Sequence, residues 1–134
     1  MTFDKTIIVF GEPASKANQR RLVTIRGRPA FIKSAKANDY AKSFQQQALT
    51  QIDAPTAEDV RVEMVIYYAS RRPDLDESVI LDALQGIAYL NDRQVRQREV
   101  YWGLDKENPR AVIRIVSCDV SSIPDRLNDQ RVVD

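Results

Sequence analysis

The sequence predicts an α+β fold, a single domain in which a mixed β-sheet is packed by two main helices. Two patterns predict it. From Val60 to Tyr68 every second residue is apolar, which is typical of a strand with one buried face. From Ala37 to Ile52 apolar residues recur at steps of three and four, which is typical of a helix with one buried face. The remaining elements interleave with these two, so one sheet with helices packed against it is the simplest arrangement.

Three segments precede the first helix. The apolar run Ile7–Phe10 predicts a buried strand, because Gly and Pro follow it closely. The segment Gly11–Arg21 is rich in Gly, Pro, Ser and Asn and predicts a loop. The segments Leu22–Ile25 and Pro29–Ile32 predict a β-hairpin whose turn contains Gly27.

Both helices have a start signal. Ser34 is expected to cap a helix that begins at Ala35 and ends before Asp53. Asp76 or Ser78 is expected to cap the second helix. Its predicted apolar face consists of Val79, Ile80, Ala83, Leu84 and Ile87. After a turn at Asn91 and Asp92, two further strands are expected over Val95–Trp102 and Ala111–Val116.

Length and composition predict one soluble domain. The chain has 134 residues, of which 43% are apolar and 29% charged, as in ordinary globular proteins. We expect the folded domain over residues 1–118 and a polar C-terminal tail over residues 119–134. No apolar run is long enough for a membrane-spanning helix, and no signal-peptide pattern is evident. We therefore expect no membrane partner and a cytoplasmic location.

The chain contains no histidine and one cysteine, Cys118. This excludes Ser-His-Asp and Cys-His nucleophile systems, and it excludes zinc sites built from histidine or several thiolates. Any bound metal must therefore lie among oxygen ligands, which favours magnesium, manganese or calcium.

Charge is divided unevenly along the chain. Residues 1–50 hold nine Lys or Arg and three Asp or Glu, so this half is strongly basic and the remainder is acidic. A basic segment suits a polyanion such as nucleic acid, although uneven charge can also reflect two solvated faces. The candidate DNA-binding residues are Lys16, Arg20, Arg21, Arg26, Arg28, Lys33, Lys36, Arg71 and Arg72.

Four carboxylates form the candidate catalytic group. In an extended chain Asp74 and Asp76 point the same way, and such a pair is relieved by a bound cation. Glu77 adds a third carboxylate, and the strand–helix–turn path is expected to bring Asp92 back toward the end of the strand. The alternative interpretation is structural: Asp76 serves only as a helix cap and Asp92 only as a turn residue.

Three motifs in register resemble the RusA family of endodeoxyribonucleases, also called Holliday junction resolvases. They are Gly11–Lys16, Arg72–Asp76 followed by Leu81–Leu84, and Asn91–Val95. The resemblance spans residue 7 to about residue 117. It implies a dimeric, Mg²⁺-dependent nuclease, often encoded by phages and prophages, in which Asp74, Asp76 and Asp92 bind the metal. It also implies that the loop Gly11–Lys16 contacts DNA.

Two positions depart from the family pattern. Glu77 stands where the family usually has Asn, so it is a candidate extra ligand or base. The family lysine that follows in the second helix is missing, because no lysine lies between Lys42 and Lys106. Lys16, Lys33 and Lys36 are candidates to replace it.

Hydrolysis of a DNA phosphodiester with Mg²⁺, or with Mn²⁺ as a substitute, is the leading hypothesis for the activity. The expected partners are branched DNA, in the form of a four-way junction, and a second copy of the chain. The alternatives are a branched-DNA or nicking nuclease in phage genome processing and a junction-binding protein without activity. An RNA-binding module is disfavoured, because the aromatic residues are interpreted as core or sheet residues.

Overall fold

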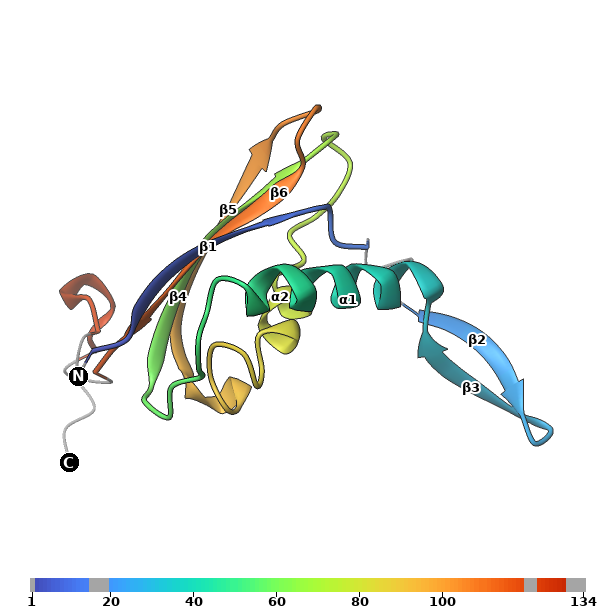
Figure 1. Ribbon diagram of the computed structural model, residues 1–134, viewed down its shortest axis with the longest axis horizontal. Helices are drawn as coiled ribbons and strands as arrows, with labels where there is room; N and C mark the ends of the chain where they lie inside the picture. Colours follow the sequence, from blue (N-terminus) through green and yellow to red (C-terminus); the bar gives the residue numbers. More distant parts are fainter. Residues whose placement is uncertain (1, 15–19, 120–122, 130–134) are drawn as a thin grey trace.

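The computed structural model describes residues 2–14, 20–119 and 123–129; for Arg20, Arg21 and Lys33 it describes the backbone only. The described elements form a four-stranded mixed sheet, two helices and a separate two-stranded hairpin (Figure 1). The predicted α+β architecture is therefore confirmed. The order of the elements is β1 Asp4–Phe10, β2 Arg20–Ile25, β3 Arg28–Lys33, α1 Ala35–Leu49, β4 Val60–Tyr68, α2 Glu77–Ala83, the 3₁₀ turn η2 Asp92–Gln94, β5 Val95–Leu104, β6 Arg110–Ser117 and the 3₁₀ turn η3 Asp125–Leu127.

The four-stranded sheet has the order β1-β6-β4-β5. The pairs β1–β6 and β4–β6 are antiparallel, whereas β4 and β5 are parallel. The parallel pair requires a crossover, which the loop after β4, α2 and η2 provide. The candidate carboxylates all lie in this crossover.

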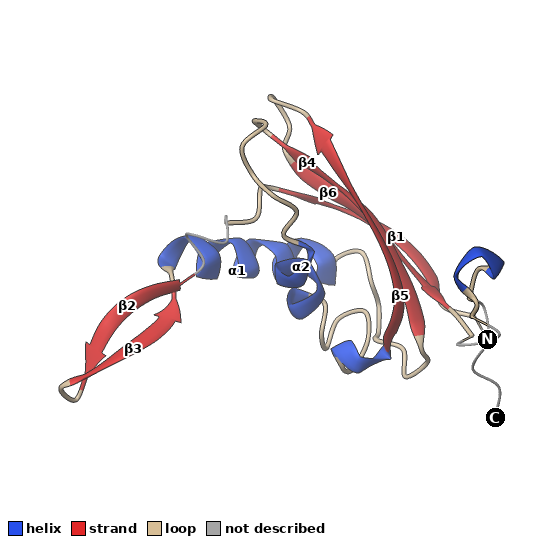
Figure 2. Ribbon diagram, turned by 180° about the vertical axis from the view of Figure 1, so that it is seen from behind, coloured by secondary structure: helices blue, strands red, loops and turns tan. Residues whose placement is uncertain are grey.

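Both helices lie on one face of the sheet (Figures 1 and 2). The even-numbered residues of β4, from Val60 to Tyr68, are all buried, as their alternation predicts. They pack in one core with Phe44 of α1 and Ile80 of α2. The fold therefore buries one face of the sheet and leaves the other in contact with solvent.

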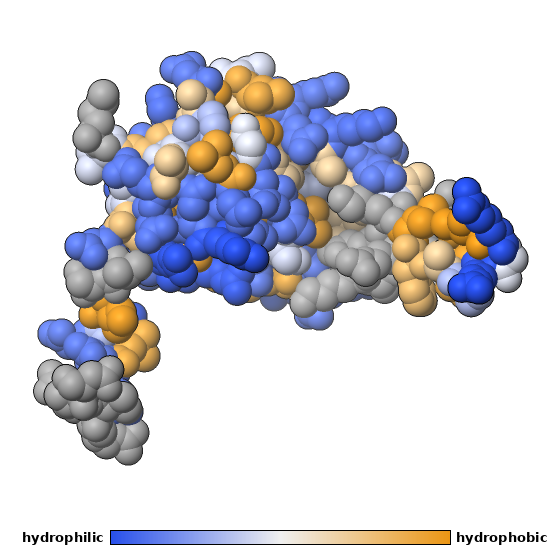
Figure 3. Space-filling model, turned by 90° about the horizontal axis from the view of Figure 1, so that it is seen from below, coloured by the Kyte–Doolittle hydropathy of each residue, from blue (hydrophilic) through white to orange (hydrophobic). Residues whose placement is uncertain are grey.

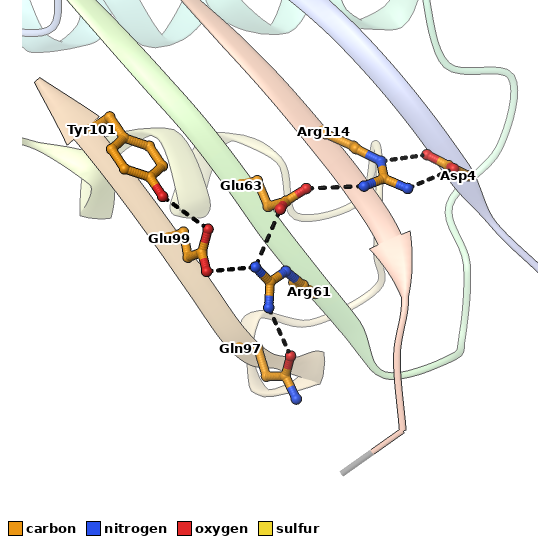
Figure 4. Close-up of polar contacts among 7 residues, drawn as sticks. All are labelled: Asp4, Arg61, Glu63, Gln97, Glu99, Tyr101 and Arg114. Carbon is orange, nitrogen blue, oxygen red and sulfur yellow. Dashed lines mark hydrogen bonds and ion pairs between the residues drawn. The ribbon is translucent and has the colours of Figure 1, made fainter. Parts of the chain in front are cut away.

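The open face of the sheet carries a row of alternating charges across all four strands (Figure 4). Arg114 of β6 lies 3.0 Å from Asp4 of β1 and 3.0 Å from Glu63 of β4. Arg61 contacts Glu63 at 3.2 Å and Glu99 of β5 at 2.6 Å. Because the signs alternate, this face offers no concentrated positive surface to a nucleic acid.

The outer edge of β1 is covered by side chains of α1. The Gln51 amide accepts from the Ile8 N–H at 3.0 Å and donates to its C=O at 2.8 Å. Gln47 makes the same pair of bonds with Phe10, at 2.8 and 2.9 Å. An exposed edge invites pairing with another strand, and these amides occupy those backbone groups.

Several predicted boundaries shift in the structure. The first helix ends at Leu49 and not just before Asp53, although Ile52 remains buried. The second helix ends at Ala83, because Gly86 adopts φ 82 and the chain turns there, with the Gly86 N–H donating to Tyr89 O at 2.7 Å. Strand β1 starts earlier than predicted, since its polar residues also pair with β6.

Candidate active site

Two aromatic side chains fix the loop that follows β4. The Tyr68 hydroxyl donates to the C=O of Asp74 at 2.9 Å and accepts from the N–H of Asp76 at 3.1 Å. The Trp102 indole N–H donates to the C=O of Pro73 at 2.9 Å. The two rings stack with centroids 5.8 Å apart. The backbone of residues 73–76 is therefore held by side chains of β4 and β5.

The two aspartates of this loop have different surroundings. Asp74 is exposed, whereas Asp76 is 1% exposed and is the one charged residue buried in the described part of the chain. The expectation that both point the same way assumed an extended strand, but β4 ends at Tyr68 and the loop turns back. Asp76 occupies the N-cap position of α2, yet its side chain makes no capping hydrogen bond. Helix capping therefore does not explain why this carboxylate is buried at a cost in desolvation.

The pKa of the Tyr68 hydroxyl is affected by the negative charges around this loop. Burial is the main cause that raises the pKa of Tyr68 to about 12, and the charges of Asp76, Glu12 and Glu77 raise it further. Glu12 is thus a carboxylate near the candidate site that the sequence patterns did not single out. The one sequence feature that could have drawn attention to Glu12 is that it is an acidic residue within the basic half of the chain.

Asp92 begins the short turn η2, which other residues hold in place. The Asn91 carboxamide accepts from the N–H of Arg93 at 2.9 Å. The Gln94 carboxamide accepts from the N–H groups of Leu90 and Asn91 and donates to the carbonyls of Thr56 and Glu58. These bonds give the turn its shape through Asn91 and Gln94, while the Asp92 residue stays exposed.

A polar cavity of about 480 Å³ lies beside Asp92. Its lining comes from α2, η2 and β5 and consists of Ser78, Leu81, Asp82, Asp92, Val95, Arg96, Gln97 and Arg98. Burial and then the charges of Asp92 and Asp82 raise the pKa of the nearby Tyr89. The sequence patterns had not identified Asp82, Arg96 or Arg98 as site residues. These residues line one cavity only because α2 and β5 pack beside each other in the fold.

The candidate carboxylates come from two segments of the crossover, the loop before α2 and the turn η2. Val60 lies opposite Val95, and Tyr68 lies opposite Leu104. Asp92 therefore lies near the start of β4, whereas residues 73–76 follow its end and lead into α2, whose Ser78 lines the same cavity as Asp92. Among residues 2–14, 20–119 and 123–129, no three Asp, Glu or Cys side chains gather as a metal-binding group. Binding of a metal by Asp74, Asp76 and Asp92 stays a prediction.

The candidate DNA-binding residues fall on two regions. Arg26, Arg28 and Lys36 are exposed on the hairpin and the start of α1. Arg71 and Arg72 are exposed in the loop before Asp74. Arg20, Arg21 and Lys33 belong to the hairpin strands, and Lys16 lies outside the described residues.

A sheet whose crossover carries several carboxylates, together with a basic hairpin, fits an enzyme that acts on nucleic acid. A family model described as endodeoxyribonuclease RusA matches residues 11–116, which is most of the chain. This match places the chain in a class of proteins described as endodeoxyribonucleases. The chain belongs to the RusA family, which acts on Holliday junctions, so the resemblance seen in the three sequence motifs is confirmed.

Curated proteins include no significant match to this chain. Within the described ranges, no helix has the length and apolar character needed to cross a membrane.

Proposed function

We propose that this protein is a Mg²⁺-dependent, structure-selective endonuclease that resolves four-way DNA junctions by paired incisions. The observation that carries this proposal is the fixed loop at residues 73–76. Its backbone is bonded to Tyr68 and Trp102, and it presents the exposed Asp74 next to the buried Asp76. Such anchoring suits a catalytic group, because productive positions must be held closely.

The chemistry of the donor set fits a hard divalent cation. Asp74, Asp76 and Asp92 offer carboxylate oxygens, which magnesium and manganese prefer. In this proposal these three residues hold Mg²⁺, with Mn²⁺ as a substitute. When bound, the cation supplies charge stabilisation at the phosphate and activation of water.

The protein's own side chains supply the remaining functions. Glu77, partly exposed at the start of α2, serves as a further ligand or accepts the proton of the attacking water on its carboxylate. Arg71 and Arg72 are exposed just before Asp74 and pair with phosphates of the bound strand. A homodimer suits this task, because a junction presents two symmetry-related strands for cleavage.

A second candidate is a protein that binds junctions without cutting them. Two observations favour it. No three candidate ligands gather in the described part of the chain, and no lysine lies between Lys42 and Lys106. A branched-DNA or nicking nuclease in phage genome processing is a variant of the main proposal with another substrate.

The deciding experiment is cleavage of a labelled synthetic four-way junction, with a nicked flap and a plain duplex as comparisons. Each is incubated with Mg²⁺, with Mn²⁺ and with a chelator. Symmetric cuts in the junction that require the divalent cation are the expected result. Preferential cutting of the flap favours the variant substrate. Junction binding with no cuts under any metal favours the second candidate.

The metal assignment is tested with Asp74→Asn, Asp76→Asn and Asp92→Asn. Each is expected to abolish cleavage and to leave junction binding in place. Asp39→Asn, an exposed carboxylate on α1, is the matched control. Full cleavage by the Asp74 and Asp76 variants would rule out their role as ligands.

A further inference from the structure

The β2–β3 hairpin extends away from the rest of the protein. It continues outward from the start of α1 and lies apart from the four-stranded sheet (Figure 1). None of its described side chains belongs to the hydrophobic core. A two-stranded hairpin alone is marginally stable in water, so this element is suited to gain stability from a bound partner.

One face of the hairpin carries an exposed apolar pair. Leu22 and Phe31 lie directly opposite each other in the register and are 62% and 70% exposed. Residues two positions apart share a face of a strand, so Thr24 and Pro29 extend this face toward the turn. Figure 3 shows apolar surface along the hairpin and a hydrophilic outer end.

The charges around this pair are of one sign. Residues 20–38 contain six Lys or Arg and no Asp or Glu. Two of the cations, Arg26 and Arg28, are exposed at the tight turn, where Arg26 and Gly27 have φ 51 and 78. Positive φ at both central residues is the geometry of a type I′ turn. The turn therefore places two arginines at the far end of the hairpin.

The positive charge of the hairpin indicates what kind of partner it can bind. Two hairpins of the same chain would bring like charges together, so self-association through this face is opposed electrostatically. A nucleic acid supplies phosphates for the cations and, where its helix is interrupted, base faces for an aromatic side chain. An intact duplex keeps its bases stacked and offers such faces only if it is distorted.

We propose that the hairpin is a wedge in which Phe31 and Leu22 contact unstacked bases at the branch point of the DNA. Arg26 and Arg28 bind the phosphates of the adjoining arms. This wedge gives preference for branched over uniform duplex DNA, without reading base sequence. The inference rests on the proposed function for its substrate class, but it concerns binding and not the cleavage step.

The test measures binding in chelator, so cleavage does not interfere. Phe31→Ser and the double variant Leu22→Ser/Phe31→Ser are compared with the unmodified protein on a four-way junction and a duplex of equal length. The expected result is a fall of about tenfold or more in the ratio of junction affinity to duplex affinity, in line with a lost base–aromatic stack. Phe31→Trp, which keeps an aromatic face, is expected to retain the ratio.

One matched control and one further test variant accompany these changes. Leu49→Ser removes an apolar side chain of similar exposure, 61%, at the far end of α1 and is expected to change nothing. Arg26→Gln/Arg28→Gln is expected to weaken binding to both DNAs. It should also lower the slope of log affinity against log salt concentration by about two, one for each lost phosphate contact. Circular dichroism of every variant establishes that the fold is intact.

A base analogue gives a direct readout. 2-Aminopurine at the branch point should brighten when the unmodified protein binds and unstacks it, and Phe31→Ser should remove this response. An unchanged affinity ratio for Phe31→Ser overturns the wedge, as does an equal loss on junction and duplex. Loss of a DNA-free dimer in Leu22→Ser/Phe31→Ser, seen by sedimentation, would instead assign this face to a second copy. If the protein never cleaves but the ratio falls as expected, the nuclease proposal fails and the wedge stands.

Discussion

The phenol ring of Tyr68 stacks on the indole of Trp102, with the ring planes inclined by 25°. The two residues come from the parallel neighbours β4 and β5. Each also forms a hydrogen bond to the loop that contains Asp74 and Asp76. The same aromatic pair therefore joins the hydrophobic core to the candidate catalytic loop.

Tyr68→Phe should separate catalysis from DNA binding. The change keeps the ring but leaves the Asp74 carbonyl and the Asp76 N–H without the hydroxyl, at a cost of about 1–3 kcal/mol in stability. We expect single-turnover junction cleavage to fall by about 10- to 100-fold, because the loop carboxylates lose their positions. Affinity for the junction should remain within about twofold. Tyr67→Phe on the open face is the control, and equal losses in cleavage and binding would contradict this role.

Tyr40→Phe should leave stability unchanged or raise it by up to about 1 kcal/mol. Tyr40 is 7% exposed, and its hydroxyl has no hydrogen-bond partner among the described residues. Burial raises the pKa of this hydroxyl. Tyr89→Phe is the matched comparison and should be destabilising, because it removes a bond to the carbonyl of Leu81. Urea unfolding of both variants measures the difference.

Gly103→Ala should lower the free energy of unfolding by about 1–3 kcal/mol. A Cβ atom at this position in β5 would lie 2.6 Å from the Tyr67 ring and 3.2 Å from Val65. The ring is also in contact with the Arg110 guanidinium, 4.2 Å from its centroid, so it has little room to move. The same change in a Tyr67→Ala background should cost clearly less. An equal cost in both backgrounds would locate the strain elsewhere.

Acid should weaken the fold through the charged row on the open face. Arg114 lowers the pKa of Asp4, and Arg61 followed by Tyr101 lowers the pKa of Glu99. The ordinary values are 3.8 and 4.5. Because both values are depressed in the folded state, this stabilisation is present above about pH 4.5 and is lost as the pH falls.

The double variant Asp4→Asn/Glu99→Gln should therefore lose less stability than the unmodified protein between about pH 4.5 and pH 3. Urea midpoints measured across this range provide the test. Asp53→Asn, an exposed carboxylate in the loop after α1, is the control. If the urea midpoints of the double variant and of the unmodified protein changed in parallel with pH, the charged row would not be the source of the acid sensitivity.

Divalent cations should raise the melting temperature if the candidate ligands bind them, because a ligand that binds only the folded state stabilises it. We expect Mg²⁺ and Mn²⁺ to give a concentration-dependent increase in the melting temperature that a chelator reverses. Asp76→Asn and Asp92→Asn should each reduce the increase. An increase of the same size in both variants would place the cation at other residues.

Much of the fold could be predicted from local patterns. The alternation over Val60–Tyr68 identified the central strand, and the apolar spacing from Ala37 identified α1 with its cap at Ser34. Both patterns reflect burial of one side of a regular element, and that side repeats with the period of the element. The Gly in Arg26–Arg28 likewise marked the hairpin turn, because its backbone conformation is a local property.

Local patterns were less informative about boundaries and about the candidate site. The end of α2 depends on how Gly86 turns the chain toward Tyr89. The spacing of Asp74 and Asp76 predicts a common direction only for extended chain. The bonds from Tyr68 and from Trp102, the latter 29 residues from its partner Pro73, produce another path in which one carboxylate is buried.

The sequence by itself determined the family, the residue types available for chemistry and the division of charge along the chain. These depend on composition and on motifs that can be read directly. Tertiary structure decided which carboxylates share a neighbourhood, brought the charge of Glu12 near the Tyr68 hydroxyl, and left Leu22 and Phe31 uncovered. These relationships arise because strand pairing and helix packing join residues that are far apart in sequence, and each depends on the whole arrangement of the sheet.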